Sequence, residues 1–309
     1  MARYLVTGGA GFIGSHLVEA LHSDGHAVAV LDDLSTGRRE NLPADAPLVV
    51  DDINRIGAHP DLWRGLDGCF HLAAVASVQR GTEDWAGCHD VNARGTIAVF
   101  EAARDHGVPV VYASSAAVYG DPIALPQAED ALLRPLTAYG ADKLASELHA
   151  RVAGGVHGVP THGLRFFNVY GPRQDPRSPY SGVVSVFCDR LLADRPIVVH
   201  GDGAQSRDFV AVADVVRALR AALGAAALDA PVTNVCTGRS TSVLELSHTL
   251  ARVIGVTPRV SHGPARVGDI RHSVGDPARL HETLGMTAET PLAEGLAALV
   301  AWARATAPA

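Results

Sequence analysis

A glycine-rich turn near the start of the chain restricts the possible folds more than any other feature of the sequence. The aliphatic run Arg3–Thr7 leads into Gly8-Gly-Ala-Gly-Phe-Ile-Gly14, and an amphipathic helical pattern follows. Glycines at 8, 11 and 14 permit a tight turn, close approach of the backbone to a pyrophosphate, and close packing of helix on strand. Unpaired N–H groups at the start of the helix attract phosphate. The segment predicts a dinucleotide-binding unit.

An acidic residue follows this turn at the spacing that a nicotinamide dinucleotide requires. Asp32 ends the second predicted strand, 18 residues after Gly14. Its carboxylate can accept hydrogen bonds from the adenosine ribose hydroxyls. Because its charge would repel a 2′-phosphate, the sequence favours NAD over NADP. A similar turn that holds no dinucleotide is the alternative interpretation.

Short aliphatic runs alternate with helical patterns through the first half of the 309-residue chain. This alternation is typical of an α/β fold of the Rossmann class, a doubly wound parallel sheet with helices on both faces. The expected strands are Arg3–Thr7, Ala27–Leu31, Leu48–Val50, Cys69–Ala73, Val110–Ala113, His162–Phe167 and Val232–Cys236. The expected helices include Gly11–Ser23, Asn92–His106 and Tyr139–Val152.

The character of the sequence changes after Phe167. Residues 168–180 are rich in proline and turn-forming residues, which predicts a long ordered loop. We expect residues 1–167 and 210–236 to form an NAD-binding domain. Residues 168–209 and 237–309 should form a smaller, mixed α/β substrate domain.

Composition argues against several classes of function. The formal net charge of −7 disfavours a nucleic-acid-binding surface, which needs clustered positive charge. No run approaches the roughly 18 consecutive apolar residues of a membrane span, and no signal peptide precedes the first strand. We therefore expect a cytoplasmic protein with no membrane partner. The four cysteines lack metal-ligand spacing, so we expect reduced thiols and no bound metal.

A tyrosine and a lysine open the third predicted helix, and this lysine is the only one in the chain. Tyr139 and Lys143 are four residues apart and so lie on one helix face. A free phenol has a pKa of about 10 and is a poor base at neutral pH. An ammonium about 4 Å away contributes roughly 4 kcal/mol at an effective dielectric constant of about 20. With the positive charge of NAD⁺ added, we expect a lowered pKa and a general-base role for Tyr139.

Several segments together resemble the extended short-chain dehydrogenase/reductase family. They are the Gly-x-x-Gly-x-x-Gly turn, Asp52-Ile53, His71-Leu-Ala-Ala74, Asn92 in Val-Asn-Ala-Arg-Gly-Thr, and Tyr139 with Lys143. The resemblance implies an NAD site made of Gly8, Gly11, Phe12, Ile13, Gly14, Asp32, Asp33, Ser35, Thr36, Gly37, Asp52, Ile53, Leu72, Ala73, Ala74, Asn92, Tyr139, Lys143 and Phe166. It also implies that the Ser115 hydroxyl holds the substrate oxygen while the proton moves. Ser114 is expected to be structural.

The segment after Ser115 bears on the type of reaction. Nucleotide-sugar dehydratases and decarboxylases of this family carry an acid just before Val-Tyr-Gly, whereas this chain has Ala116 and Ala117 there. Removal and return of a hydride are therefore supported, but no eliminating group is evident. This pattern favours epimerisation.

The second half of the chain looks closest to the UDP-glucose 4-epimerases and their UDP-N-acetylhexosamine relatives, on segments 165–176, 201–210 and 265–271. By this resemblance the UDP-sugar would contact Ser115, Asn168, Val183, Val198, His200, Arg207, Arg266 and Asp269. Asn168 would bind a phosphate, and Arg207 and Arg266 would clamp the diphosphate with their guanidinium forks. Asp269 would accept the uridine ribose hydroxyls, and strand 197–200 would flank the uracil. The alternatives are a surface ion pair between Arg207 and Asp208, and a solvated Arg266.

Ser273 bears on the choice of sugar. In the family, a bulky tyrosine at this position excludes N-acetyl groups, so the small serine predicts that UDP-N-acetylhexosamines are accepted as well as UDP-glucose and UDP-galactose. The resemblance also implies a homodimer through the helices at 92–106 and 139–152, although their apolar faces could equally pack on the sheet. The other functions left open are a UDP-glucuronate epimerase or decarboxylase, another NAD-dependent nucleotide-sugar enzyme, an alcohol dehydrogenase, and a non-catalytic NAD-sensing protein.

Overall fold

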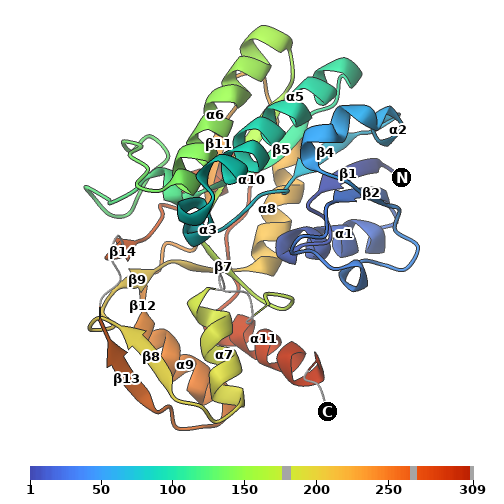
Figure 1. The fold of residues 1–309 in the computed structure, drawn as a ribbon. Coiled ribbons are helices and arrows are strands. Elements are labelled where there is room, and N and C mark those ends of the chain that lie inside the picture. Colours follow the sequence, from blue (N-terminus) through green and yellow to red (C-terminus); the bar gives the residue numbers. More distant parts are fainter. Residues whose placement is uncertain (176–181, 265–269, 307–309) are drawn as a thin grey trace.

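A parallel sheet of seven strands forms the centre of the larger lobe of the computed structural model, which describes residues 1–175, 182–264 and 270–306 (Figure 1). The strand order is β11-β6-β5-β4-β1-β2-β3. The strands are β1 (Arg3–Thr7), β2 (Ala27–Asp32), β3 (Leu48–Val50), β4 (Gly68–His71), β5 (Val110–Ser115), β6 (Thr161–Phe166) and β11 (Val232–Val235). The order reverses between β1 and β4, where this class of sheet opens a crevice for ligands. The predicted doubly wound Rossmann sheet is confirmed.

Helices cover both faces of this sheet. One layer contains α1 (Phe12–Ser23), α8 (Val212–Gly224) and α10 (Ala278–Leu284), and the other contains α2 (Pro60–Trp63), α5 (Gly95–His106) and α6 (Ala138–His157). Successive strand residues serve opposite layers, so Val6 packs with α1 and α8 whereas Leu5 packs with α5 and α6. Burial on both faces explains why these strands read as continuous aliphatic runs.

Shorter elements connect the strands and helices of the large lobe. Between β4 and α5 the chain forms α3 (Val78–Glu83), α4 (Trp85–His89) and the π-helical turn η3 (Asp90–Arg94). Single 3-10 turns occur at η1 (Arg39–Asn41), η2 (Ile53–Ala58) and η4 (Ala116–Val118). The last of these directly follows β5 and lies next to the start of α6.

The smaller lobe lies below the large sheet in Figure 1 and has its own apolar core. Helices α7 (Val183–Leu192), α9 (Val243–Ile254) and α11 (Leu292–Thr306) supply most of that core. Strands β8 (Ile197–His200) and β13 (Val260–Gly263) pair in parallel, and β9 (Ser206–Arg207) lies between β12 (Thr241–Ser242) and β14 (His272–Ser273). The predicted mixed α/β character of this part is confirmed.

The main difference from the sequence-based expectation lies directly after β6. Residues 168–170, predicted as the start of a loop, form β7 (Asn168–Tyr170), which pairs in parallel with β10 (Phe209–Ala211). The Asn168 N–H donates to the Asp208 carbonyl at 2.9 Å, and the Asp208 carboxylate accepts from the Thr237 N–H at 2.8 Å. Because these partners are distant in sequence, no local pattern announces the strand.

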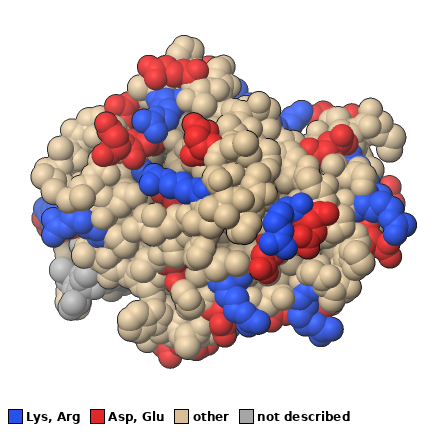
Figure 2. Space-filling model, turned by 90° about the horizontal axis from the view of Figure 1, so that it is seen from above, with Lys and Arg blue, Asp and Glu red and all other residues tan. Residues whose placement is uncertain are grey.

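The surface charges, the cysteines and the helix lengths can also be compared with the expectations from composition. On the face shown in Figure 2, basic and acidic side chains are interspersed. All four cysteines are buried and unpaired. Within the described ranges, no helix has the length and apolarity to cross a membrane, and no cluster of histidine, cysteine and acidic side chains could hold a metal ion.

Candidate active site

Five strands of the large sheet end at the same edge. Thr7, Asp32, His71, Ser115 and Phe166 are the last residues of β1, β2, β4, β5 and β6. Since parallel strands end together, segments far apart in sequence meet at this edge. Phe166 itself is buried in the apolar layer of α1 and α8.

The glycine turn packs closely against the segment that follows β4 and against the start of α1. Gly8 has a φ of +68°, and a Cβ there would lie 2.6 Å from the Ala73 nitrogen. A Cβ on Gly14 would lie 2.1 Å from the Gly8 carbonyl oxygen, so only glycine lets α1 start this close to β1. A Cβ on Gly11 would meet only the Gly8 oxygen, at 3.3 Å. Together with the free N–H groups of Phe12 and Ile13 at the helix start, this geometry fits a pyrophosphate.

Asp32 also has a structural role that the sequence did not reveal. Its carboxylate accepts from the Ala10 N–H and the Leu34 N–H, each at 2.9 Å, and so joins the glycine turn to the following loop. Burial raises the pKa of this carboxyl group. A Cβ on Gly37 would lie 2.7 Å from Asp32 Oδ1, so the loop folds back onto the carboxylate.

The remaining predicted NAD residues lie in the loops around this turn. Asp33 accepts from the Ser35 hydroxyl at 2.6 Å and closes the loop that also contains the exposed Thr36. Asp52 is exposed and caps η2 by accepting from the Asn54 N–H at 2.9 Å. Ile53 is instead buried under α5.

Asn92 fixes the segment that follows β4. Its amide oxygen accepts from the Val75 N–H at 2.8 Å, and its amide nitrogen donates to the Val75 carbonyl at 3.3 Å. Leu72, Ala73 and Ala74 are thereby held between the end of β4 and η3. This segment lies against the glycine turn through Gly8.

A buried polar chain supports the same segment and was not predicted. His71 Nδ1 lies 2.7 Å from the Thr7 hydroxyl, and His71 Nε2 lies 3.0 Å from the Thr96 hydroxyl. Because Thr96 donates to the Asn92 carbonyl at 2.6 Å, it accepts from His71, whose proton therefore sits on Nε2. Burial, with the charge of Lys143, lowers the pKa of His71 to about 3, so the ring is neutral.

Tyr139, Lys143 and Ser115 meet at the end of β5. The Lys143 ammonium donates to the Ala113 carbonyl at 2.9 Å and lies 5.8 Å from the centroid of the Tyr139 ring. The Ser115 hydroxyl lies close enough to the Tyr139 phenol to lower its pKa. It also accepts from the Ala117 N–H at 3.2 Å, which begins η4. The three predicted catalytic side chains are therefore neighbours.

The electrostatics of this group differ from the sequence-based expectation. Burial raises the pKa of Tyr139 above its ordinary value, and the hydrogen bond from Ser115 opposes that shift. Burial also lowers the pKa of Lys143 to about 8, opposed by the charge of Asp142. The expected lowering included the charge of NAD⁺ and a cation about 4 Å from the phenol. The Lys143 ammonium donates to the Ala113 carbonyl and lies 5.8 Å from the centroid of the Tyr139 ring.

A buried network behind the catalytic group was also missed. Arg165 on β6 forms a bidentate ion pair with Glu147 on α6, with Nε to Oε1 at 2.8 Å and Nη2 to Oε2 at 2.7 Å. The Ser114 hydroxyl donates to the same carboxylate at 2.5 Å. Arg165 Nη1 donates to the Tyr119 hydroxyl and to the Glu129 carbonyl, each at 2.9 Å. Ser114 is thus bonded within the core, as a structural serine should be.

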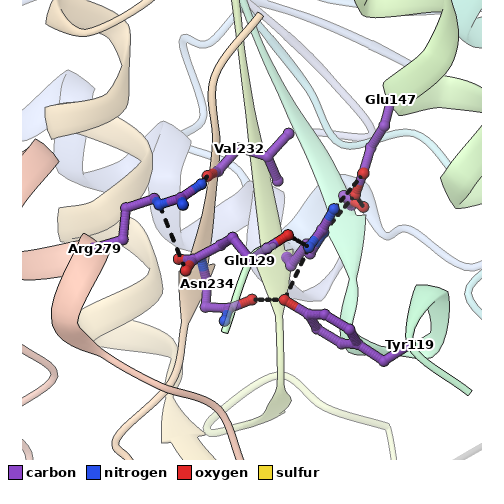
Figure 3. A network of polar contacts seen from close by, with 8 residues as sticks. Tyr119, Glu129, Glu147, Val232, Asn234 and Arg279 are labelled. Atoms are coloured by element: carbon purple, nitrogen blue, oxygen red, sulfur yellow. Dashed lines mark hydrogen bonds and ion pairs between the residues drawn. The ribbon is translucent and has the colours of Figure 1, made fainter. Parts of the chain in front are cut away.

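The network continues towards β11 (Figure 3). The Tyr119 hydroxyl donates to the Asn234 side-chain oxygen at 2.7 Å, and the Asn234 N–H donates to the Glu129 carboxylate at 2.7 Å. Arg279 pairs with Glu129 at 3.6 Å. One sequence pattern could have indicated Glu147 as part of this network, because it repeats the four-residue spacing of Tyr139 and Lys143.

Residues 172–175 lie across the first turns of α1. The Pro172 carbonyl is 3.0 Å from His16 Nε2, and Arg173 pairs with Glu19 at 2.5 Å. Asp175 pairs at 2.5 Å with Arg38, in the loop that follows β2. These contacts tie the segment after β7 to both sides of the glycine turn.

The predicted UDP-sugar residues that the structure describes lie on the smaller lobe and at its junction with the large sheet. Asn168 is exposed on β7, Val183 is half-buried at the start of α7, and Val198 is exposed on β8. On β8, His200 Nδ1 lies 3.1 Å from the Pro264 carbonyl.

Arg207 on β9 is directly beside Ser273 on β14. Its Nη1 donates to the Ser206 carbonyl at 2.8 Å. The carboxylate of Asp208 is buried and bonded to Thr237 and Gly238, so the alternative of a surface ion pair with Asp208 is wrong. Arg266 and Asp269 lie outside the described residues.

Comparison with known proteins agrees with this geometry. Residues 4–236 match the model of the NAD dependent epimerase/dehydratase family. A protein named UDP-glucose 4-epimerase from Mycolicibacterium smegmatis is 41% identical, with 98% of each chain covered. The structure of a UDP-glucose 4-epimerase from Thermus thermophilus in complex with NAD has a TM-score of 0.91 and 37% identity, covering 99% of this chain and 100% of that one.

A third similar protein acts on an N-acetylated sugar. The UDP-N-acetylglucosamine 4-epimerase from Methanobrevibacter ruminantium, solved with UDP-N-acetylmuramic acid, has a TM-score of 0.94 and 32% identity, with 99% of each chain covered. The glycine turn, the Tyr139–Lys143 pair and the full-length likeness all lead to the same assignment. The chain belongs to the NAD dependent epimerase/dehydratase family, within the extended short-chain dehydrogenase/reductases.

Proposed function

We propose that this enzyme interconverts UDP-hexoses that differ in configuration at C4, through a 4-keto sugar and with NAD retained throughout the cycle. The observation that carries the proposal is the meeting of Tyr139, Lys143 and Ser115 at the sheet edge beside the glycine turn. The chain is an NAD-dependent epimerase, as its full-length similarity to named UDP-glucose 4-epimerases supports.

The side chains suit proton transfer at a sugar hydroxyl. Bound NAD supplies a hydride acceptor at C4 of the sugar and later a hydride donor. Tyr139 takes the proton from O4 and gives it back to O4 after the 4-keto sugar has turned, so that the hydride would return to the opposite face of C4, while the Ser115 hydroxyl holds the oxygen in place. Lys143 favours the ionised phenol by its charge. Ala116 and Ala117 place no acid beside this group, which supports epimerisation over elimination.

Two arrangements support retention of cofactor and substrate. Residues 172–175 connect α1 to the loop after β2 across the glycine turn, which would hinder release of NAD. We propose that Asn168, Arg207, Arg266 and Asp269 anchor the UDP group, and that Val183, Val198 and His200 line its pocket. On this basis residues 1–167 and 210–236 bind NAD, and residues 168–209 and 237–309 bind the UDP-sugar.

The position of Ser273 supports a pocket that admits an N-acetyl group. Ser273 lies beside Arg207 in the register of β14 and β9, on the side proposed to hold the diphosphate. A hydroxymethyl side chain there leaves room that a phenol ring would fill. The likeness to a UDP-N-acetylglucosamine 4-epimerase points the same way.

A homodimer through α5 and α6 completes the proposal. Leu148, Val152 and Val156 project from α6 with exposed fractions of 53%, 46% and 72%. They recur at a spacing of four residues, which makes one apolar stripe. Two such stripes, related by a two-fold axis, would bury each other in a four-helix contact.

Replacing Tyr139 with phenylalanine should abolish epimerisation. Tyr139→Phe keeps the ring but removes the proton acceptor, so kcat should fall by about 10²–10⁴-fold. NAD content should be unchanged. NMR of the sugars formed from UDP-galactose without added NAD measures both turnover and product identity. Tyr4→Phe, on β1, is the matched control, and wild-type turnover by Tyr139→Phe would refute the assignment.

Lys143 should reduce stability at neutral pH. Its pKa falls from about 10.4 in the unfolded chain to about 8 in the folded protein, so the cost of burying its charge is fully present below pH 8. Lys143→Met should therefore raise the free energy of unfolding at pH 7 by roughly 1–2 kcal/mol, after the loss of one hydrogen bond. This gain should shrink between about pH 8 and 10.

Urea denaturation at pH 7 and pH 9.5 measures the effect of Lys143→Met. The exposed Arg64 provides a control, since Arg64→Met should show no pH-dependent gain. A Lys143→Met variant less stable than wild type at pH 7 would contradict the argument.

Enlarging residue 273 should restrict the sugar. Ser273→Tyr should lower kcat/KM for UDP-N-acetylglucosamine on the order of 100-fold, with a much smaller effect on UDP-galactose. Ser261→Tyr on the exposed side of β13 should change neither. If the wild-type enzyme turns over UDP-galactose but not UDP-N-acetylglucosamine, the proposed pocket is wrong.

A charge on the α6 stripe should dissociate the dimer. Val156→Asp places a carboxylate in the proposed contact, so light scattering after gel filtration should show a monomer. Val256→Asp, on the smaller lobe, should remain dimeric. A monomeric wild-type protein at micromolar concentration would count against the interface.

A further inference from the structure

Helix α6 is attached to three consecutive residues of β5. The Lys143 ammonium bonds to the Ala113 carbonyl at 2.9 Å, and the Glu147 carboxylate accepts from the Ser114 hydroxyl at 2.5 Å. The Ser115 hydroxyl is close enough to the Tyr139 phenol to oppose the rise of its pKa. The three α6 residues are spaced by four and so share one helix face. The three contacts therefore hold this face of α6 against the last residues of β5.

Among these three contacts, the one from Glu147 is the most rigid. Both of its carboxylate oxygens are bonded to Arg165 of β6, at 2.8 and 2.7 Å, and both side chains are 3% exposed. Arg165 is itself fixed by the Tyr119 hydroxyl and by the Glu129 carbonyl, each at 2.9 Å. Figure 3 shows this chain of contacts continuing from Tyr119 to Asn234 and Glu129. Glu147 thus cannot rotate without breaking several buried bonds.

We propose that Ser114 and Glu147 are positioning residues that set the placement of Tyr139 against Ser115 by fixing how far α6 lies along β5. Neither side chain faces the sheet edge where substrate would bind, because both are buried in the network behind it. The inference rests on the proposed epimerase function. It deepens that function, since a displacement of about 1 Å of a reacting group can reduce the rate on the order of 100-fold.

Ser114→Ala is the decisive variant. It removes the hydroxyl that joins β5 to Glu147 but leaves the Glu147–Arg165 ion pair intact, so the protein should fold and retain NAD. We expect kcat for UDP-galactose to fall by roughly ten-fold or more, with KM within about two-fold of wild type. The Ser115 bond that lowers the pKa of Tyr139 should weaken, so the acid limb of the kcat–pH profile should move to higher pH.

Ser247→Ala provides a matched control. Ser247 is equally buried and donates to the Leu244 carbonyl at 2.7 Å within α9, remote from α6. It should also lose a buried hydrogen bond but keep kcat and the pH profile. Glu147→Gln, which preserves the shape of the side chain but not its charge, should lower kcat further. If Glu147→Gln does not fold, Ser114→Ala still tests the inference.

The outcomes separate this inference from the proposed function. A wild-type protein that does not epimerise UDP-galactose overturns the proposed function and, with it, the inference. An active wild type, together with a Ser114→Ala variant whose kcat and pH profile equal those of Ser247→Ala, overturns the positioning role alone. A fall in kcat accompanied by an equal loss of NAD also overturns it, because the effect would then act through the cofactor.

Discussion

The bidentate contact between Arg165 and Glu147 places two opposite charges inside the sheet-and-helix core, where charges are costly to desolvate. Their separation of 2.7–2.8 Å and the added bonds from Ser114 and Tyr119 satisfy both groups. Apolar residues of equal volume would stabilise such a core as well or better. The pair joins β6 to α6 through hydrogen bonds of fixed geometry, and the Ser114 hydroxyl extends this contact to β5. We propose that the geometry of the catalytic group depends on these contacts.

A neutral histidine and a buried ammonium contribute to the electrostatics of the catalytic group. His71 is neutral, held as the Nε2–H tautomer between two threonine hydroxyls, and Lys143 places a positive charge 5.8 Å from the centroid of the Tyr139 ring. Burial acts on both Tyr139 and Lys143 in the direction that removes charge, which opposes the ionised phenol that the reaction needs. Binding of a positively charged nicotinamide beside them would shift this balance towards the phenolate.

Local sequence patterns were enough to predict most of the fold, the glycine turn and the catalytic pair. The glycine turn, Asp32 and the Tyr139–Lys143 pair depend on short-range spacing, and all of them lie at the edge where the strands of the large sheet end. The His71 chain, the Arg165 network and the β7–β10 pairing were missed because their partners are tens of residues apart. Helix α6 runs past its predicted end at Val152 and continues through Gly154, although glycine weakens helices. A larger residue would not fit at 154, because a Cβ would lie 2.0 Å from the Leu228 carbonyl oxygen. The roles of Arg266 and Asp269 stay predictions.

The solitary lysine has a practical consequence. The chain contains one side-chain amine, and in the folded state only 3% of that residue is exposed. Reagents that acylate amines will therefore not react with Lys143 in the native protein, whereas movement of α6 away from β5 would expose it. Mass spectrometry of such a labelling time course would measure how often α6 separates from β5, because the chain has no second lysine side chain that could be acylated.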